Sequence, residues 1–138
     1  MSAISGKVKL QGKSVLVIED DFVLLKSMAE AFSRAGAVVA VAPDGALGMQ
    51  QFTKSRPDLV VTDIIMPDKE GIETIAEMRA FAPALPILAI SGGGRVKAGE
   101  FLSLARSLGA TDVMAKPFRT QDLLDKAAEL LPASSEQS

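Results

Sequence analysis

The chain has 138 residues, of which 48% are hydrophobic and 23% charged, and its formal net charge is −2. This length suits one domain with its own core, and this composition argues against intrinsic disorder. Because the chain has neither cysteine nor histidine, it cannot form a disulfide, a thiolate or imidazole metal site, or a Ser-His-Asp triad, so any metal must be held by oxygen ligands.

Strand-like and helix-like segments alternate along the chain. The expected strands, in chain order, are Val15–Ile18, Val38–Val41, Leu59–Thr62, Pro86–Ile90 and Val113–Ala115. Between the first four strands we expect helices at Phe22–Arg34, after the cap Asp44, and at Gly71–Ala80. A fourth helix carries Phe101, Leu104, Ala105 and Leu108 before the last strand, and a fifth carries Leu123, Ala127, Leu130 and Leu131 after it. This alternation predicts an α/β domain at 13–131, a doubly wound parallel sheet, with flexible tails at 1–12 and 132–138.

Polar residues follow four of the five expected strands. Glu19-Asp20-Asp21 follows the first strand, Asp63 the third, Ser91 and three glycines the fourth, and Lys116 the fifth. Ligands of open α/β sheets bind beyond the carboxyl ends of the strands, where the strand order reverses. With the order 2-1-3-4-5, that point lies between the two strands that end in carboxylates. Glu19, Asp20 and Asp63 should therefore meet there, with Ser91 and Lys116 approaching from the other side.

An acidic cluster of this kind predicts a divalent cation. Two carboxylates ~4 Å apart repel each other by roughly 4 kcal/mol at an effective dielectric constant near 20. A cation that prefers oxygen ligands, such as Mg²⁺, removes this repulsion. Together with one lysine, the cluster and Mg²⁺ can hold a phosphoryl group that a carboxylate attacks in line.

Each of these groups has an ordinary structural explanation when it is taken alone. The acids after the first strand could cap a helix, Asp63 could belong to a turn, the Ser91 segment could be a flexible loop, and Lys116 could be a solvated surface residue. Phe101, Met114 and Phe118 are better explained as core or partner surface than as a cofactor site. We prefer the functional interpretation because the fold brings four of the groups to one edge of the sheet.

These residues resemble the receiver domain of two-component response regulators, over about Ser14 to Leu131. The resemblance is carried by Val15–Asp21, Asp63-Ile64-Ile65-Met66-Pro67, Gly71, Ile90-Ser91-Gly92 and Ala115-Lys116-Pro117-Phe118. It implies the flavodoxin-like (βα)5 receiver fold and a single-domain response regulator. Such a protein promotes its own phosphorylation and slow dephosphorylation and is not a turnover enzyme.

The resemblance also implies a role for each site residue. Asp63 accepts a phosphoryl group from a histidine kinase or histidine phosphotransfer protein. Mg²⁺ is bound by Asp20, Asp63 and the carbonyl of Ile65, and by Glu19 mainly through water. Ser91 hydrogen-bonds the phosphoryl group, Lys116 contacts its oxygens, and the Lys116–Pro117 bond is cis. A downstream output protein binds the face formed by helix four, strand five and helix five.

Two positions depart from the usual pattern of this family. Glu19 stands where Asp is more frequent, and Val113, three residues before Lys116, stands where Tyr or Phe is usual. These departures keep open a receiver-like scaffold that binds partners without phosphorylation. An aspartyl-phosphate phosphatase is a third alternative, but the second acid that such enzymes carry two residues after the nucleophile is Ile65 here.

Composition also bears on partners and location. Lys and Arg are scattered, and Trp and Tyr are absent, so we see neither a basic stripe nor a stacking platform for nucleic acid. No run approaches the roughly 20 apolar residues of a membrane span, and the first 13 residues contain no signal-peptide core. We expect a cytoplasmic protein with no nucleic-acid or membrane partner.

Overall fold

The structure is a computed structural model that describes residues 9–64, 70–92, 103, 107 and 109–132. One parallel sheet is built from β1 (Ser14–Ile18), β2 (Val38–Ala42), β3 (Leu59–Asp63), β4 (Ile87–Ser91) and β5 (Asp112–Ala115). The strand order is β2-β1-β3-β4-β5. The predicted doubly wound sheet and its strand order are therefore confirmed.

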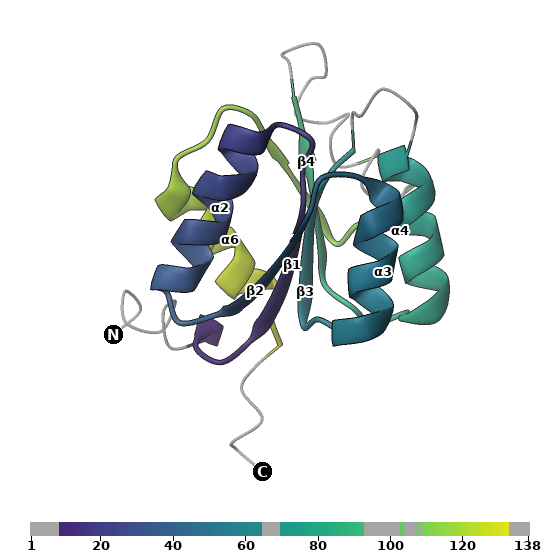
Figure 1. The fold of residues 1–138 in the computed structure, drawn as a ribbon, viewed down its shortest axis with the longest axis horizontal. Coiled ribbons are helices and arrows are strands. Elements are labelled where there is room, and N and C mark those ends of the chain that lie inside the picture. Colours follow the sequence, from purple (N-terminus) through teal and green to yellow (C-terminus); the bar gives the residue numbers. More distant parts are fainter. Residues whose placement is uncertain (1–8, 65–69, 93–102, 104–106, 108, 133–138) are drawn as a thin grey trace.

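Helices cover both faces of the sheet, as Figure 1 shows. On one face lie α2 (Phe22–Arg34) and α6 (Thr120–Leu130), and on the other lie α3 (Gly45–Ser55) and α4 (Glu70–Phe81). Successive side chains of β1 point to opposite faces of the sheet and belong to two different cores. Val17 packs with Phe32 on the α2 side, and Ile18 packs with Phe52 on the α3 side. Burial on both faces explains why the inner strands read as continuous apolar runs.

Aspartate side chains cap the N-termini of α2 and α3 near the site, and a glycine follows the opposite end of α2. Asp44 is the N-cap of α3, as predicted, and its Oδ1 accepts a hydrogen bond of 2.8 Å from the Leu47 N–H. Asp21 is the N-cap of α2, and its Oδ1 accepts from the N–H groups of Val23 and Leu24. Gly36 follows α2 with a φ of 93°, a left-handed conformation that glycine adopts without steric penalty.

Helix α3 lies unusually close to β1 at Gly48. A Cβ atom at this position would lie 2.5 Å from Cδ1 of Ile18, which is fully buried. Only glycine lets the helix backbone approach the strand this closely. The contact supports the end of β1, directly before Glu19.

Several predicted boundaries shift by one or two residues. Strand β4 ends at Ser91 and begins after Pro86, so Ser91 belongs to the strand and does not follow it. The predicted helix carrying Phe101, Leu104, Ala105 and Leu108 lies outside the described residues. None of the helices within the described ranges has the length and apolar character that a membrane crossing requires.

Part of the predicted N-terminal tail is packed against the domain. Leu10 is 1% exposed and belongs to the core on the α2 side. The N–H of Gly12 donates a hydrogen bond of 2.8 Å to the carbonyl of Gly36. Residues 9–12 are therefore part of the folded unit, which corrects the expected tail at these positions. The other domain bounds stay predictions.

Candidate functional site

Three carboxylates meet where β1 and β3 end. The two strands pair in parallel with Ile18 opposite Thr62, so the residues that follow, Glu19 and Asp63, are neighbours. Glu19, Asp20 and Asp63 each offer a carboxylate oxygen, and these atoms lie within 4.8 Å of one another. Glu19 and Asp63 are buried, whereas Asp20 is exposed. The structure thus brings together the three acids that the sequence analysis selected.

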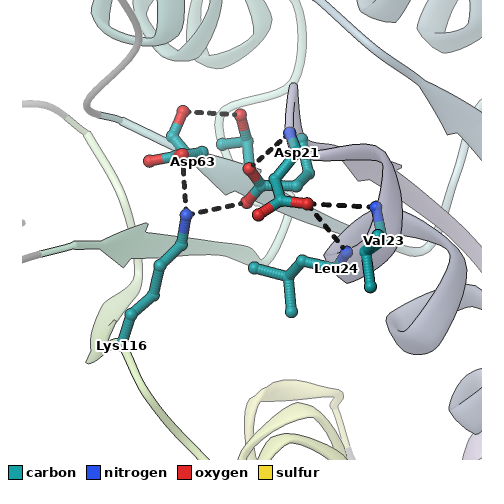
Figure 2. A network of polar contacts seen from close by, with 7 residues as sticks. Asp21, Val23, Leu24, Asp63 and Lys116 are labelled. Carbon is teal, nitrogen blue, oxygen red and sulfur yellow. Dashed lines mark hydrogen bonds and ion pairs between the residues drawn. The ribbon is translucent and has the colours of Figure 1, made fainter.

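Lys116 reaches this cluster from the end of β5. Its Nζ lies 3.0 Å from Oδ2 of Asp63 and 3.1 Å from Oε1 of Glu19. Figure 2 shows the lysine side chain extended towards Asp63 and the turn that holds Asp21. The backbone N–H of Lys116 donates to the carbonyl of Ser91, 2.8 Å away, and the Lys116–Pro117 bond is cis. The ammonium therefore bridges two of the three acids.

Glu19 is held by chain contacts at both carboxylate oxygens. Oε1 pairs with Lys116, and Oε2 accepts a hydrogen bond of 3.0 Å from the N–H of Asp21. Burial raises the pKa of Glu19; the Asp21 N–H and Lys116 oppose this effect, and the charge of Asp63 adds to it. The net direction is upward, so the fold disfavours a charge on this carboxylate.

The charge of Lys116 is supported by the acids around it. Burial alone would lower the pKa of Lys116, but hydrogen bonds to Asp63 and Glu19, together with their negative charges, raise it above its ordinary value. Lys116 is therefore a stable cation at neutral pH. The cluster holds three carboxylates and this one ammonium, which leaves an excess of negative charge.

The donor set fits a divalent cation of the Mg²⁺ type. All three ligating candidates offer carboxylate oxygen, the ligand that Mg²⁺ prefers, and the excess negative charge is of the right sign to bind it. The carbonyl of Ile65, the fourth expected ligand, lies outside the described residues.

Ser91 lies at the end of β4, between the strands that supply Asp63 and Lys116. Ile90 is opposite Asp63, and Ser91 is opposite Ala115. Its side chain is fully buried, and among the described residues its Oγ has no hydrogen-bond partner. A buried hydroxyl normally finds a partner, so this group is suited to bind a ligand.

The acidic run after β1 divides between two roles. Asp21 caps α2, which is the structural explanation considered for the whole run, while Glu19 and Asp20 join Asp63. Sequence reasoning missed one nearby contact: the Thr62 hydroxyl donates to the carbonyl of Asp63, 3.2 Å away. Threonine is common in strands for its β-branched shape, so no sequence signal distinguishes this role.

Three hydrophobic side chains near the end of β5 pack against the two cores. Val113 is half-buried against the core on the α3 side, while Met114 and Phe118 pack against the core on the α2 side. Met114 and Phe118 were expected to be core or partner surface, and both are partly buried residues that pack against the core; Phe101 lies outside the described residues.

Sequence comparison matches this chain to one family model and to several curated proteins. The model of the response regulator receiver domain matches residues 15–128. The chain is 32% identical over 121 residues to the response regulator MprA of Mycobacterium sp. strain KMS, covering 88% of this chain and 51% of that protein. It is also 32% identical over 117 residues to the transcriptional regulatory protein PrrA of Mycobacterium tuberculosis, covering 85% and 49%. The chain thus spans about half the length of these curated relatives.

Two solved structures with the same fold match this chain over nearly their whole length. The receiver domain of NtrX from Brucella abortus is 28% identical, with a TM-score of 0.77 over 87% of this chain and 99% of that one. The chemotaxis protein CheY4 of Vibrio cholerae is 25% identical, with a TM-score of 0.78 over the same shares.

Proposed function

Because the chain belongs to the response regulator receiver domains of two-component systems, which are signalling domains and not turnover enzymes, we propose that it is a switch phosphorylated on Asp63. The phosphoryl donor is the phosphohistidine of a histidine kinase or histidine phosphotransfer protein. Asp20, Asp63 and the carbonyl of Ile65 would hold Mg²⁺ directly, and Glu19 would hold it mainly through water. The observation that best supports this proposal is the Lys116 ammonium, 3.0 Å from Asp63 within a cluster of three acids.

The transfer is a displacement at phosphorus. A carboxylate oxygen of Asp63 attacks the phosphorus atom, the P–N bond to the donor imidazole breaks, and the bonding electron pair leaves with the imidazole nitrogen. Such transition states spread negative charge over the equatorial oxygens, so catalysis depends on positioning and charge neutralisation. When bound, Mg²⁺ supplies part of that neutralisation.

The chain's own residues supply the rest. Lys116 places a cation where the phosphoryl oxygens gather, at the oxygen of Asp63 that it already contacts. Ser91 offers a buried hydroxyl as a hydrogen-bond donor to one of those oxygens. Asp63 is 3% exposed, so bulk water has little access to its carboxylate, which favours transfer from a docked donor over loss to solvent.

The output of the switch is the binding of a partner protein. We propose that it occurs on the face formed by the expected helix that carries Phe101, Leu104, Ala105 and Leu108, by β5 and by α6. We propose no direct role for nucleic acid or membrane, and a cytoplasmic location. One matched relative is named a transcriptional regulatory protein. Since the chain spans about half of that relative, the whole relative's activity is not carried over to this chain.

A phosphodonor assay tests the proposal directly. Incubation with acetyl phosphate and Mg²⁺ should add one phosphoryl group by mass spectrometry, and beryllofluoride with Mg²⁺ should raise the melting temperature. Asp63→Asn should abolish both effects. Asp112→Asn, which removes a carboxylate that pairs with Lys126 outside the site, should retain them. An adduct that survives Asp63→Asn contradicts the proposal.

A scaffold that needs no phosphorylation is the second candidate, favoured by Val113 at the position that usually carries an aromatic residue. A pull-down of partners with and without phosphodonor separates the two. If the captured proteins are the same for the wild type, for Asp63→Asn and in both conditions, the scaffold is correct and the switch is not.

A further inference from the structure

The outer edge of β2 carries no feature that would prevent it from pairing with another chain. Strand β2 lies at the end of the sheet and reads Val-Val-Ala-Val-Ala, without a charge or a proline. Val38 is 63% exposed and Val41 is 43% exposed. Natural edge strands usually carry a lysine, a proline or a bulge that prevents pairing with another chain, and this one carries none within its five residues.

The backbone groups that this edge presents follow from its pairing with β1. The N–H of Val38 donates to the carbonyl of Lys13, and the carbonyl of Ala42 accepts from the N–H of Glu19, so both residues face β1. Because the direction alternates along a strand, the N–H and C=O groups of Val39 and Val41 face outwards. The edge therefore offers two donors and two acceptors beside apolar side chains.

We propose that β2 pairs antiparallel with β2 of a second copy of this chain, around a two-fold axis at Ala40. In this register Val39 of one copy lies opposite Val41 of its partner, and the converse pair is identical. Val39 and the opposed Val41 both face outwards, so they form a hydrogen-bonded pair in which the N–H of each residue donates to the carbonyl of the other. Four hydrogen bonds use every outward group of Val39 and Val41.

The side chains fit the same arrangement. At the axis, alanine faces alanine, so nothing bulky prevents close approach of the strands. The other opposed pairs combine valine with valine or valine with alanine, and no charge meets a like charge. An isologous contact of this kind closes a dimer and leaves no further free edge at β2. The two five-stranded sheets then form one continuous sheet.

This pairing leaves the acidic cluster untouched. Strands β1 and β3 supply the acids and Lys116 follows β5, while β2 supplies no side chain to the cluster. The dimer is therefore independent of phosphorylation. One strand pair buries less than the roughly 1,200–2,000 Å² of a standard stable interface, so the association is weak and depends on concentration.

Cysteine cross-linking tests the register sharply, because the chain contains no cysteine of its own. In Ala40→Cys the two thiols lie opposite each other in a non-hydrogen-bonded pair, with Cα atoms about 4.5 Å apart, a distance that a disulfide spans. In Val38→Cys the two thiols are offset by four residues, about 13 Å along the strand, and cannot be joined.

We expect Ala40→Cys to form a disulfide-linked dimer at least about tenfold faster than Val38→Cys under mild oxidation, because pairing raises the effective thiol concentration. The control is stringent, since residue 38 is the more exposed of the two and random collision would favour it. Equal rates, or a faster rate for Val38→Cys, overturn the proposal.

Sedimentation equilibrium of the cysteine-free chain gives a second, independent test. The apparent mass should rise with concentration for the wild type and for Asp63→Asn, and Val41→Lys should abolish the rise. Phe81→Lys, the same kind of change at a residue of α4 that is 69% exposed, should leave it unchanged. A chain that stays monomeric at millimolar concentration overturns the pairing and leaves the edge to a different extended segment.

Discussion

Glu19 and Lys116 form an ion pair of 3.1 Å that joins a fully buried carboxylate to an ammonium whose side chain is 25% exposed. The same ammonium contacts Asp63, so one lysine compensates two buried negative charges. Removing one partner of a buried pair leaves the other charge without compensation, which destabilises a protein far more than loss of a surface pair does.

Lys116→Met should therefore destabilise the metal-free protein strongly. We expect the free energy of unfolding to fall by about 3 kcal/mol, because Glu19 and Asp63 then face each other without their common cation. Mg²⁺ should raise the melting temperature of this variant more than that of the wild type. Urea denaturation in EDTA and in Mg²⁺ measures both effects.

The control is Lys126→Met, which removes the ion pairs of Lys126 with Asp112 and Glu129 outside the site. These pairs are partly solvated, so we expect a loss of at most about 1 kcal/mol and no change in the Mg²⁺ effect. Equal losses in the two lysine variants would show that Lys116 does not hold the acidic cluster together.

Glu19→Gln should change how stability depends on pH. Burial raises the pKa of Glu19 in the folded chain, so the folded state holds this proton to higher pH than the unfolded state. As pH rises through the unfolded pKa towards the raised one, the wild type should lose stability. Glutamine does not ionise, so the Glu19→Gln variant should not show this loss of stability with rising pH.

Chemical denaturation in EDTA at several pH values from 4 to 8 measures the effect. We expect the gap in free energy of unfolding between Glu19→Gln and the wild type to widen in favour of the variant as pH rises. Parallel pH profiles for the two proteins would mean that burial does not disfavour the Glu19 charge.

Asp63→Asn should stabilise the metal-free protein and weaken its response to metal. The change removes one negative charge from a cluster that holds three acids and one lysine, so repulsion falls. We expect a higher melting temperature in EDTA and a smaller rise on addition of Mg²⁺. An unchanged Mg²⁺ effect would show that Asp63 does not share a metal site with Asp20.

Ser91→Ala separates a ligand-binding role from a structural one. The serine Oγ is buried without a hydrogen-bond partner among the described residues, so its removal should leave the free energy of unfolding within about 1 kcal/mol of the wild type or raise it. The melting-temperature rise produced by beryllofluoride and Mg²⁺ should nevertheless shrink. A large loss of stability with a full beryllofluoride effect would assign Ser91 to the core alone.

Leu10→Ala tests the packed segment before β1. Leu10 is 1% exposed within the core on the α2 side, and truncation of a buried leucine to alanine destabilises a protein by about 2–5 kcal/mol. Phe81→Ala removes more atoms, but at a side chain that is 69% exposed, and should have a much smaller effect. Similar losses in the two variants would mean that residues 9–12 are not part of the core.

The sheet could be predicted from sequence because the apolar runs of its strands are short and β-branched, and four of the five lead directly into a polar group. Strand order followed from asking which order brings Glu19 and Asp63 together. Leu10 escaped detection because only Val8 and Leu10 alternate with polar residues before Gly12, and two apolar residues are too short a pattern to indicate burial.

The sequence pattern places Glu19 and Asp20 in the cluster, but it indicates helix capping only for the acidic run as a whole and does not assign the cap to Asp21. Asp20 and Asp21 are adjacent and chemically identical, and only the path of the backbone after Ile18 directs one to the cluster and the other to the first turn of α2. The bridging position of Lys116 was hidden for a similar reason. It depends on the reach of Glu19 and on the distance between the ends of β1 and β5, which spacing along the chain does not specify.

Strand β3 is hydrogen-bonded to β1 on one side and to β4 on the other, and every residue from Leu59 to Asp63 is buried. An added charge at its last residue therefore meets a rigid backbone in the middle of the molecule, where interiors are close-packed and resist deformation. Sliding the strand would disrupt both ladders at once. A signal that begins at Asp63 must travel outwards through side chains and the loops beyond the strand ends.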